Sequence, residues 1–410
     1  MIVIESLELS ISYNVSILER YFYVFSYIVC TTAIFPLFFE ESKINILIYT
    51  IIYPVYLFIF IKNYKQIIEE FVVENKILFI LLLLVSISFL WSDIYLVSIQ
   101  KILGFIGVTL IGIIFAYRLN FHELVKIMYS SYFIISVLSL ITVTFLPNYG
   151  IHSDIYLIGD YKGVFTNKNT LGINMVFSIF SSFCLLFLVK KRSPMILVNV
   201  IISFYLLIKS NSKTSLIMLI SLFLILILLF IIRKVIDKNL FIFFNCLFSI
   251  ILGLILFFVY KNFDYFVNML DRDPSMTGRS NIWPYVIHKI YDKPILGYGY
   301  YNFWNNPNYK LDSHFNAHDG FLDITLNVGI VGLLLFCFIL LKTFFKGYHL
   351  IYKDNINILM FSLFILLFLY NIDETNYMLT NDIKWSLFLF IVLKTNSKIS
   401  IKKSNGWRDA

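Results

Sequence analysis

Long blocks of apolar residues, separated by short polar segments, run along the whole chain. Most blocks are about 17–24 residues long, which is the length that a helix needs to cross about 30 Å of hydrocarbon. An outer-membrane β-barrel would instead show alternating segments of roughly ten residues. The pattern therefore predicts about twelve membrane-spanning helices. The predicted spans are 20–39, 45–61, 77–91, 97–117, 124–146, 170–189, 194–209, 214–232, 241–260, 321–341, 356–371 and 382–394.

The composition agrees with an all-α polytopic membrane bundle. Hydrophobic residues make up 59% of the 410 residues and charged residues only 14%, whereas soluble domains carry about 25% charged residues. The 43 Phe and 28 Tyr residues exclude a disordered polymer. The first block lacks a small-residue cleavage pattern, so we interpret it as a span and not as a signal peptide. Four cysteines, interpreted as small buried hydrophobes, lie far apart within apolar blocks: Cys30, Cys184, Cys246 and Cys337.

The distribution of charge predicts the orientation. Lys and Arg number 33 against 25 Asp and Glu, a net charge of +8. In a soluble protein this excess would suggest nucleic acid, but here the basic residues fall mainly in every second loop. That asymmetry marks cytoplasmic loops and predicts that both termini are cytoplasmic, with no nucleic-acid partner.

A single long loop divides the chain into three parts: 1–260 with the first nine spans, 261–320, and 321–410 with the last three spans and a basic tail. The loop falls on the outer, periplasmic side. Apolar residues at helical spacing predict an amphipathic helix over Asn281–Tyr291, which Pro294 ends. Basic residues that the orientation rule does not explain suggest an anionic ligand at this loop.

Several short motifs occur in a fixed order along the chain. Trp91-Ser92-Asp93 follows the third span, Gly163–Asn169 precedes the sixth and Ser212-Lys213-Thr214 opens the eighth. The long loop then carries a third group of motif residues. These are Arg279, Trp283, Pro294, Gly297 and Gly299, followed by His318, Leu322, Gly329 and Gly332.

This order of motifs resembles the O-antigen ligase/polymerase superfamily of bacterial membrane glycosyltransferases, over about residues 85–340. The resemblance implies a GT-C-like fold and transfer of a glycan from a polyprenyl diphosphate to a sugar hydroxyl. It implies that His318 is the catalytic base, because histidine titrates in the required range. It also implies that Arg279 acts at the active site by gripping the diphosphate through paired hydrogen bonds.

Four further residues are candidates for binding the diphosphate or the glycan: Lys213, Lys168, Asn169 and Trp283. For Lys168 and Asn169, ordinary capping of the sixth span is the alternative. Two positions depart from the family pattern. Lys213 stands where the family has Arg, so the charge is kept and the planar two-point grip is lost. Asp319 stands where the family usually has Asn.

Two patterns in the sequence resemble metal sites, and neither is expected to bind a metal. His314 and His318 are spaced like two ligands on one helical turn, but no HExxH motif or neighbouring cysteine supports zinc. Asp271 and Asp273 resemble an acid-x-acid metal motif, yet Pro274 follows and a solvated turn is favoured. We therefore expect no metal and no cofactor. Lys101, within the fourth span, is interpreted as snorkelling to an interface.

Three functions remain open. In a polymerase, the acceptor is a second lipid-linked repeat unit, and a chain-length regulator is a candidate partner. In a ligase, the acceptor is lipid A–core sugar. The third function is a polysaccharide transporter without catalysis, against which no internal repeat or pair of broken helices is found in the sequence. The polymerase is favoured. The expected partners are the lipid-linked donor, the glycan acceptor and the bilayer.

Overall fold

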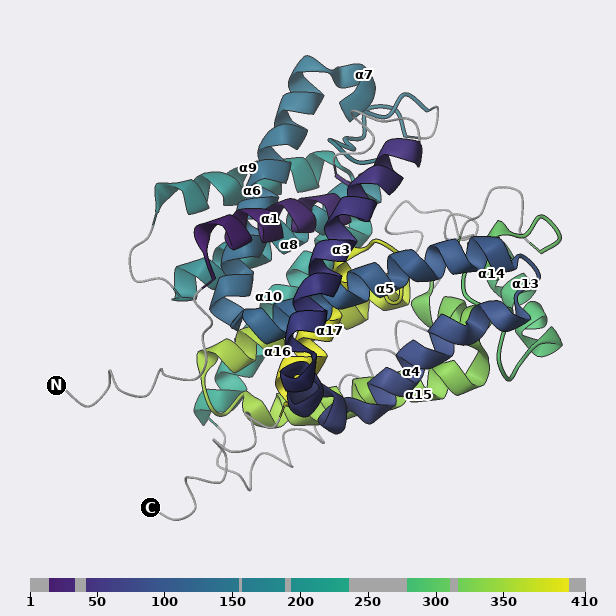
Figure 1. Cartoon of the computed structure of the whole chain (residues 1–410). Coiled ribbons are helices and arrows are strands. Elements are labelled where there is room, and N and C mark those ends of the chain that lie inside the picture. Colours follow the sequence, from purple (N-terminus) through teal and green to yellow (C-terminus); the bar gives the residue numbers. More distant parts are fainter. Residues whose placement is uncertain are drawn as a thin grey trace, which may run out of the picture.

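The computed structural model describes residues 15–33, 42–154, 157–188, 193–235, 279–309 and 316–397 (Figure 1). Most of these residues are helical. Turns and loops join the helices, and one isolated β-bridge pairs Ile151 with Tyr161. The helices are α1 Ile17–Cys30, α3 Ser42–Ile67, α4 Lys76–Ile87, α5 Tyr95–Arg118, α6 Phe121–Phe145, α7 Pro147–Gly150, α8 Lys168–Leu188, α9 Pro194–Lys209, α10 Lys213–Val235, α13 Arg279–Asp292, α14 Asn302–Asn305, α15 Gly320–Leu350, α16 Asn355–Asp373 and α17 Ile383–Asn396; η1 Ile68–Val72, η2 Val73–Asn75 and η3 Ser88–Trp91 are short π or 3₁₀ turns.

The expectation of an all-α, multi-pass membrane protein is confirmed. Within the described ranges, seven helical stretches are long and apolar enough to cross a membrane. The predicted spans 97–117, 124–146 and 170–189 correspond to α5, α6 and α8 within a few residues. These spans were predicted well because each is a single apolar run bounded by polar caps, such as the Asn120–Glu123 capping box of α6.

Some predicted spans have different lengths in the structure. The first predicted span, 20–39, is not one continuous helix, because α1 ends at Cys30 and Thr32 adopts a left-handed φ of 59°. Residues 34–39 of that span lie outside the described residues. The helices α9 and α17 have only 16 and 14 residues, less than the roughly 20 that a perpendicular span needs. The predicted span 241–260 lies outside the described residues.

The buried centre of the bundle is α17, which packs on α5. Trp385 is fully buried, and its indole N–H donates to Thr109 Oγ1 at 2.9 Å. The two helices approach closely because Gly112 has no side chain. A Cβ at that position would lie 2.9 Å from Leu389 Cβ and 3.0 Å from the Ser386 backbone. Small residues play the same part wherever helices pack without a hydrophobic driving force.

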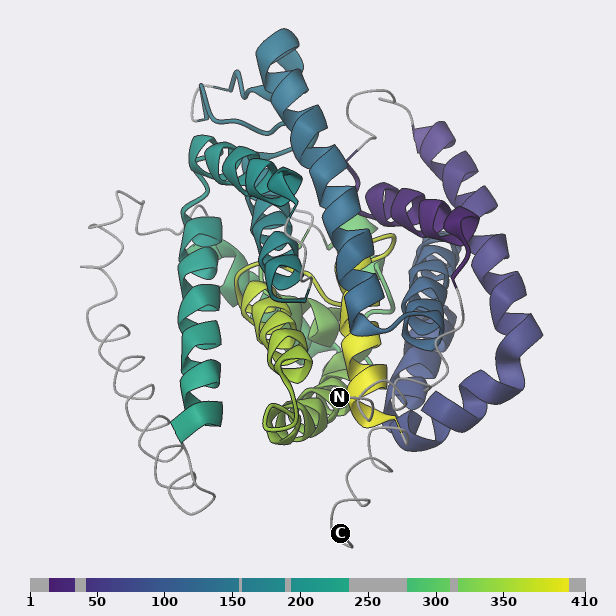
Figure 2. The same ribbon diagram turned by 90° about the vertical axis from the view of Figure 1, so that its left-hand side faces the viewer.

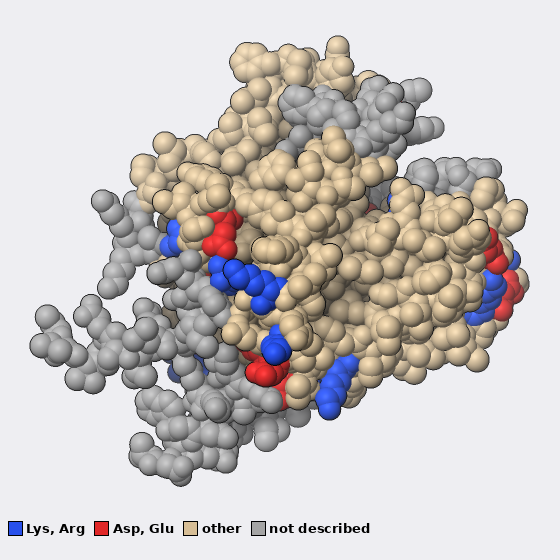
Figure 3. All heavy atoms as spheres, viewed as in Figure 1, with Lys and Arg blue, Asp and Glu red and all other residues tan. Residues whose placement is uncertain are grey.

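The outer surface is suited to lipid. Figure 3 shows charged side chains gathered at two ends of the visible face, with a broad uncharged band between them. Large apolar side chains are exposed on several helices, for example Phe58 on α3, Leu224 on α10 and Phe345 on α15. Such contiguous apolar surface marks a membrane contact in place of a water-facing surface.

The helix α15 is broken within the bundle, and a loop completes it. Gly329 has φ 68° and ψ −171°, outside the helical region. The N–H groups of Ile330 and Val331 donate to the carbonyls of residues 294 and 295, and the carbonyls of residues 326 and 327 accept from Tyr298 N and Gly299 N. The turn that follows α13 is thus inserted at the break in α15 (the splice). It supplies hydrogen-bond partners for backbone groups that lipid could not satisfy.

Candidate active site

The tryptophan motif after the third span holds this spliced turn. Trp91 Nε1 donates to the Leu296 carbonyl at 3.1 Å, and Tyr300 N donates to Ser88 Oγ at 2.9 Å. A Cβ on Gly299 would lie 2.8 Å from the Ser88 carbonyl oxygen, so only glycine fits this approach. Two motifs that lie about 200 residues apart in sequence therefore form one structural unit.

Asp93 anchors the same unit at its edge. Its carboxylate accepts from Asn302 Nδ2 at 3.0 Å and pairs with Lys293 Nζ at 3.5 Å. Burial acts to raise the pKa of Asp93, but hydrogen bonds from Asn302 and Tyr309 and the charge of Lys293 outweigh it, so the pKa lies below its ordinary value. The carboxylate therefore stays ionised and fixes α14 against the start of α5.

His318 lies in the turn that leads into α15, and it meets an acidic residue from another segment. Its Nδ1 is 2.8 Å from Glu374 Oε2, directly after α16. The two side chains are 35% and 17% exposed, so the pair sits at an accessible edge. His318 has φ 50°, and its N–H donates to Asn316 Oδ1 at 3.0 Å. A carboxylate on Nδ1 fixes the ring and leaves Nε2 for chemistry.

A buried carboxylate, Asp323, ties together the segments that carry this pair. Its Oδ1 accepts from Trp304 Nε1 of α14 at 2.7 Å. Both oxygens lie 3.2 Å from Ala317 N, one residue before His318. Oδ2 also accepts from the hydroxyl of Thr375, one residue after Glu374. The position of the His318–Glu374 pair therefore depends on Asp323.

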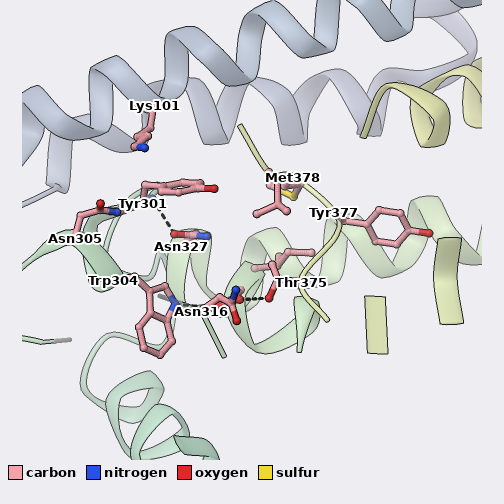
Figure 4. Close-up of a pocket in the computed structure, with 12 residues that line it drawn as sticks. Lys101, Tyr301, Trp304, Asn305, Asn316, Asn327, Thr375, Tyr377 and Met378 are labelled. Carbon is pink, nitrogen blue, oxygen red and sulfur yellow. Dashed lines mark hydrogen bonds between the residues drawn. The ribbon is translucent and has the colours of Figure 1, made fainter. Parts of the chain in front are cut away.

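A cavity of about 380 Å³ is lined by two residues that are close in sequence to the pair, Asn316 and Thr375 (Figure 4). It lies between α5, α14, the start of α15 and the segment after α16, and its volume is within the range of small-molecule sites. Its lining is rich in amide and aromatic groups, which suits a sugar. The lining includes Lys101, Tyr301, Trp304, Asn305, Asn316, Asp323, Asn327, Thr375, Tyr377 and Met378.

Strained backbone gathers around this cavity. Tyr301, His318 and Met378 are non-glycine residues with φ of 58°, 50° and 56°. Such conformations are uncommon and persist where the surroundings enforce them, often at binding and catalytic sites. Tyr301 and Met378 line the cavity, and His318 lies two residues after the lining residue Asn316.

The Lys168 and Lys213 motifs pack together at the starts of α8 and α10. Lys168 Nζ pairs with Asp160 Oδ2 at 2.6 Å, and Ser212 Oγ donates to Asn169 Oδ1 at 3.1 Å. A Cβ on Gly172 would lie 2.5 Å from Ser215 Oγ, so the two helices touch. These contacts order the motif. Whether Lys168 and Asn169 also bind substrate remains a prediction.

The direction of α10 places Lys213 at the same end of the bundle as Glu374. Arg233, near the end of α10, hydrogen-bonds Asn355 at the start of α16, so the two helices run antiparallel (Figure 2). The start of α10, where Lys213 is half-buried, is therefore level with the end of α16. Whether Lys213 binds an anion near the histidine remains a prediction.

The remaining predicted residues lie in or near the long loop. Trp283 Nε1 donates to the Ala317 carbonyl at 3.0 Å, which braces the turn before His318. Arg279 is the first residue of α13, and its side chain is outside the described residues, as are His314, Asp271 and Asp273. The predicted helix 281–291 is present as α13, with Ile282 and Val286 buried.

The departure at position 319 is conservative in structural terms. Asp319 caps α15, and its Oδ1 accepts from both Phe321 N and Leu322 N, at 2.8 and 2.9 Å. An Asn side chain offers the same single oxygen and is an equally good N-cap.

Sequence reasoning missed Glu374 and Asp323, because both act through contacts between distant segments. A usable signal existed in each case. Glu374 lies just after the end of an apolar run, and Asp323 lies within a largely apolar run. Ionisable residues at such places are functional candidates by default.

Comparison with known proteins agrees with the motifs. Residues 177–337 match the family model described as "O-Antigen ligase". The resemblance to the O-antigen ligase/polymerase superfamily is thereby confirmed. A Rickettsia felis protein named "Putative polysaccharide ligase" is 36% identical over 107 residues, which cover 23% of this chain and 26% of that protein. The match to that relative spans only about a quarter of its length.

Proposed function

We propose that this protein is an inner-membrane glycosyltransferase that polymerises polyprenyl-diphosphate-linked repeat units at the periplasmic face, with both termini in the cytoplasm. The observation that carries the proposal is the pairing of His318 with Glu374 at 2.8 Å beside an amide-lined cavity. The match of residues 177–337 to the "O-Antigen ligase" family model supports a lipid-linked glycan as the donor. The charge pattern of the loops supports the orientation.

The geometry suits a glycosyl transfer with general-base assistance. Glu374 holds Nδ1–H of His318, so Nε2 accepts the proton of an acceptor sugar hydroxyl. The hydroxyl oxygen bonds to the anomeric carbon of the donor, and the bond from that carbon to the diphosphate oxygen breaks. The bonding electrons leave with the polyprenyl diphosphate, and the carboxylate of Glu374 stabilises the imidazolium that forms.

Fixed positive charge would bind the leaving group. A diphosphate carries up to three negative charges, and arginine matches its geometry with two parallel hydrogen bonds. We assign this role to Arg279, at the start of α13, and to Lys213, at the start of α10. Together with the bilayer, which takes the polyprenyl tail, they define a donor site that needs no metal ion.

A ligase, which transfers the glycan to lipid A–core, is the second candidate. It is favoured by the description of the matching family model and by the name of the Rickettsia felis relative. The two functions share the donor and the base and differ only in the acceptor.

Substitution of His318 tests both the base and the choice of acceptor. His318→Ala in the native strain should reduce turnover by about 10²–10⁴, leaving at most one repeat unit on each core. His288→Ala is the matched control, because His288 is an exposed histidine on α13 of the same outer segment, and it should retain long chains.

The glycan pattern of the His318→Ala strain distinguishes the outcomes. Loss of all surface glycan with accumulation of long lipid-linked polymer would establish the ligase. Normal long chains, with the variant present at wild-type level in the membrane, would refute the catalytic role of His318.

A further inference from the structure

Lys101 lies within a membrane helix, and its ammonium group has no counter-ion among the described residues. It lies on α5, half-buried, and lines the cavity that Asn316 and Thr375 also line (Figure 4). Its Nζ is 5.3 Å from the centre of the Tyr301 ring. Within the described part of the chain, no carboxylate lies within 4.0 Å of this ammonium, and no hydrogen bond from it is found. A lysine that merely snorkels would place its charge in water or headgroups.

The one carboxylate that lines the cavity is already occupied. Asp323 accepts from Trp304 Nε1, Ala317 N and the Thr375 hydroxyl. It is 4% exposed, and no hydrogen bond or ion pair joins it to Lys101 among the described residues. Among the described residues, Lys101 is therefore not ion-paired with Asp323.

The neighbouring amides add donors to the same space. Asn327 Oδ1 accepts from Tyr301 N at 2.9 Å, and Asn316 Oδ1 accepts from His318 N at 3.0 Å. With each oxygen bound to a backbone N–H, the Nδ2 donor of each amide is the end left for a ligand. An ammonium and two amide donors make this cavity a site for a negatively charged group.

We propose that this cavity binds an acidic sugar of the glycan, with the sugar carboxylate paired to Lys101. This inference rests on the proposed function and specifies its substrate. A single cation matches the single charge of a carboxylate, whereas a diphosphate needs several positive groups. The rings of Tyr301 and Trp304, which also line the cavity, offer faces for a sugar ring.

The proposal is tested by binding to the full-length protein purified in detergent, measured by titration calorimetry. The probes are glucuronate, glucose as its uncharged match, and inorganic pyrophosphate. Wild type should bind glucuronate at least about tenfold more tightly than glucose. Lys101→Met should abolish this difference, and Lys101→Arg should retain it.

Two further variants keep the result interpretable. Lys346→Met is the matched control, because Lys346 is also half-buried but lies near the far end of α15, and it should bind like wild type. Asn327→Asp keeps the acceptor for Tyr301 N and adds a negative charge to the cavity that Lys101 also lines. It should weaken glucuronate binding at least about tenfold while leaving glucose binding unchanged. This opposite-sign test does not depend on Lys101→Met being well folded.

Equal affinity of wild type for glucuronate and glucose would overturn the proposal. So would pyrophosphate binding that is lost in Lys101→Met while glucuronate binding is not, because Lys101 would then serve the donor diphosphate. These failures leave the proposed function intact if His318→Ala still abolishes transfer. Lys101-dependent binding of glucuronate, together with full activity of His318→Ala, would instead refute the proposed function alone.

Discussion

The substitution Asp323→Asn should disable the enzyme although it changes only one atom of a buried side chain. Asp323 uses both of its oxygens, accepting from Trp304, from the N–H before His318 and from Thr375 after Glu374. Asparagine supplies one acceptor and one NH₂ donor, so at least one of these donors faces another donor. Losing a charge-assisted hydrogen bond and leaving a buried donor without an acceptor should lower the free energy of unfolding by about 1–3 kcal/mol.

The effect on turnover should exceed the effect on stability. The disrupted contacts hold the two turns that carry His318 and Glu374, and a displacement of about 1 Å in a reacting group can cost about 10²-fold in rate. We therefore expect a fall in transfer rate of about 10²-fold, with the protein still folded. The assay is transfer from a lipid-linked donor by purified protein, with thermal unfolding of the same sample in detergent.

Asp319→Asn is the matched control, because Asp319 is the N-cap of α15, four residues before Asp323. Asp319 makes both of its capping bonds through a single oxygen, Oδ1, and asparagine keeps that oxygen. The same chemical change should therefore have little effect at position 319. Equal losses at positions 319 and 323, or no loss at 323, would show that Asp323 does not position the catalytic pair.

Three further outcomes are expected. Gly329→Ala should destabilise the protein by more than about 2 kcal/mol, because its φ is 68° and a Cβ would lie 2.0 Å from the Ile295 carbonyl oxygen; Gly159→Ala, at φ 88° with nothing within 4 Å, should cost less, and equal thermal shifts would contradict the splice. Arg279→Ala should weaken binding of the lipid-linked donor, and Arg279→Lys should not fully restore it, since one ammonium lacks the two-point grip; full rescue in a donor-binding assay would argue against that grip. Activity in washed membranes should survive a strong chelator, and loss that added manganese or magnesium reverses would return a metal to the mechanism.

The sequence predicted the elements better than their junctions. Long apolar runs predict helices such as α5 and α8 well, because the ends of the apolar run coincide with the ends of the helix. The predicted span 321–341 is shorter than α15. It ends just before Lys342, whereas the helix continues to Leu350. Its break at Gly329 was also missed. A single glycine in an apolar run gives no sign that another segment will pair with the backbone there.

The candidate site was predicted in part for a related reason. His318 and Trp283 lie in motifs whose order along the chain is visible. The roles of Glu374 and Asp323 emerge only when α15 and α16 pack side by side. Lys101 was interpreted as a snorkelling residue, and the cavity that it faces is built from α5, α14 and the segment after α16, which no local pattern joins.

The splice at Gly329 has a consequence for biosynthesis. The backbone groups around the break take their partners from residues 294–299, and each unpaired group in hydrocarbon would cost several kcal/mol. That turn precedes α15 in the chain, so it has already been synthesised when α15 enters the bilayer. Suppose that the gene is split between residues 299 and 320 and that the N-terminal part is synthesised after the C-terminal part. The backbone groups at the break in α15 would then have no hydrogen-bond partners during insertion. A split between α9 and α10 would not have this effect, because both sides of the splice would then be synthesised together and in order.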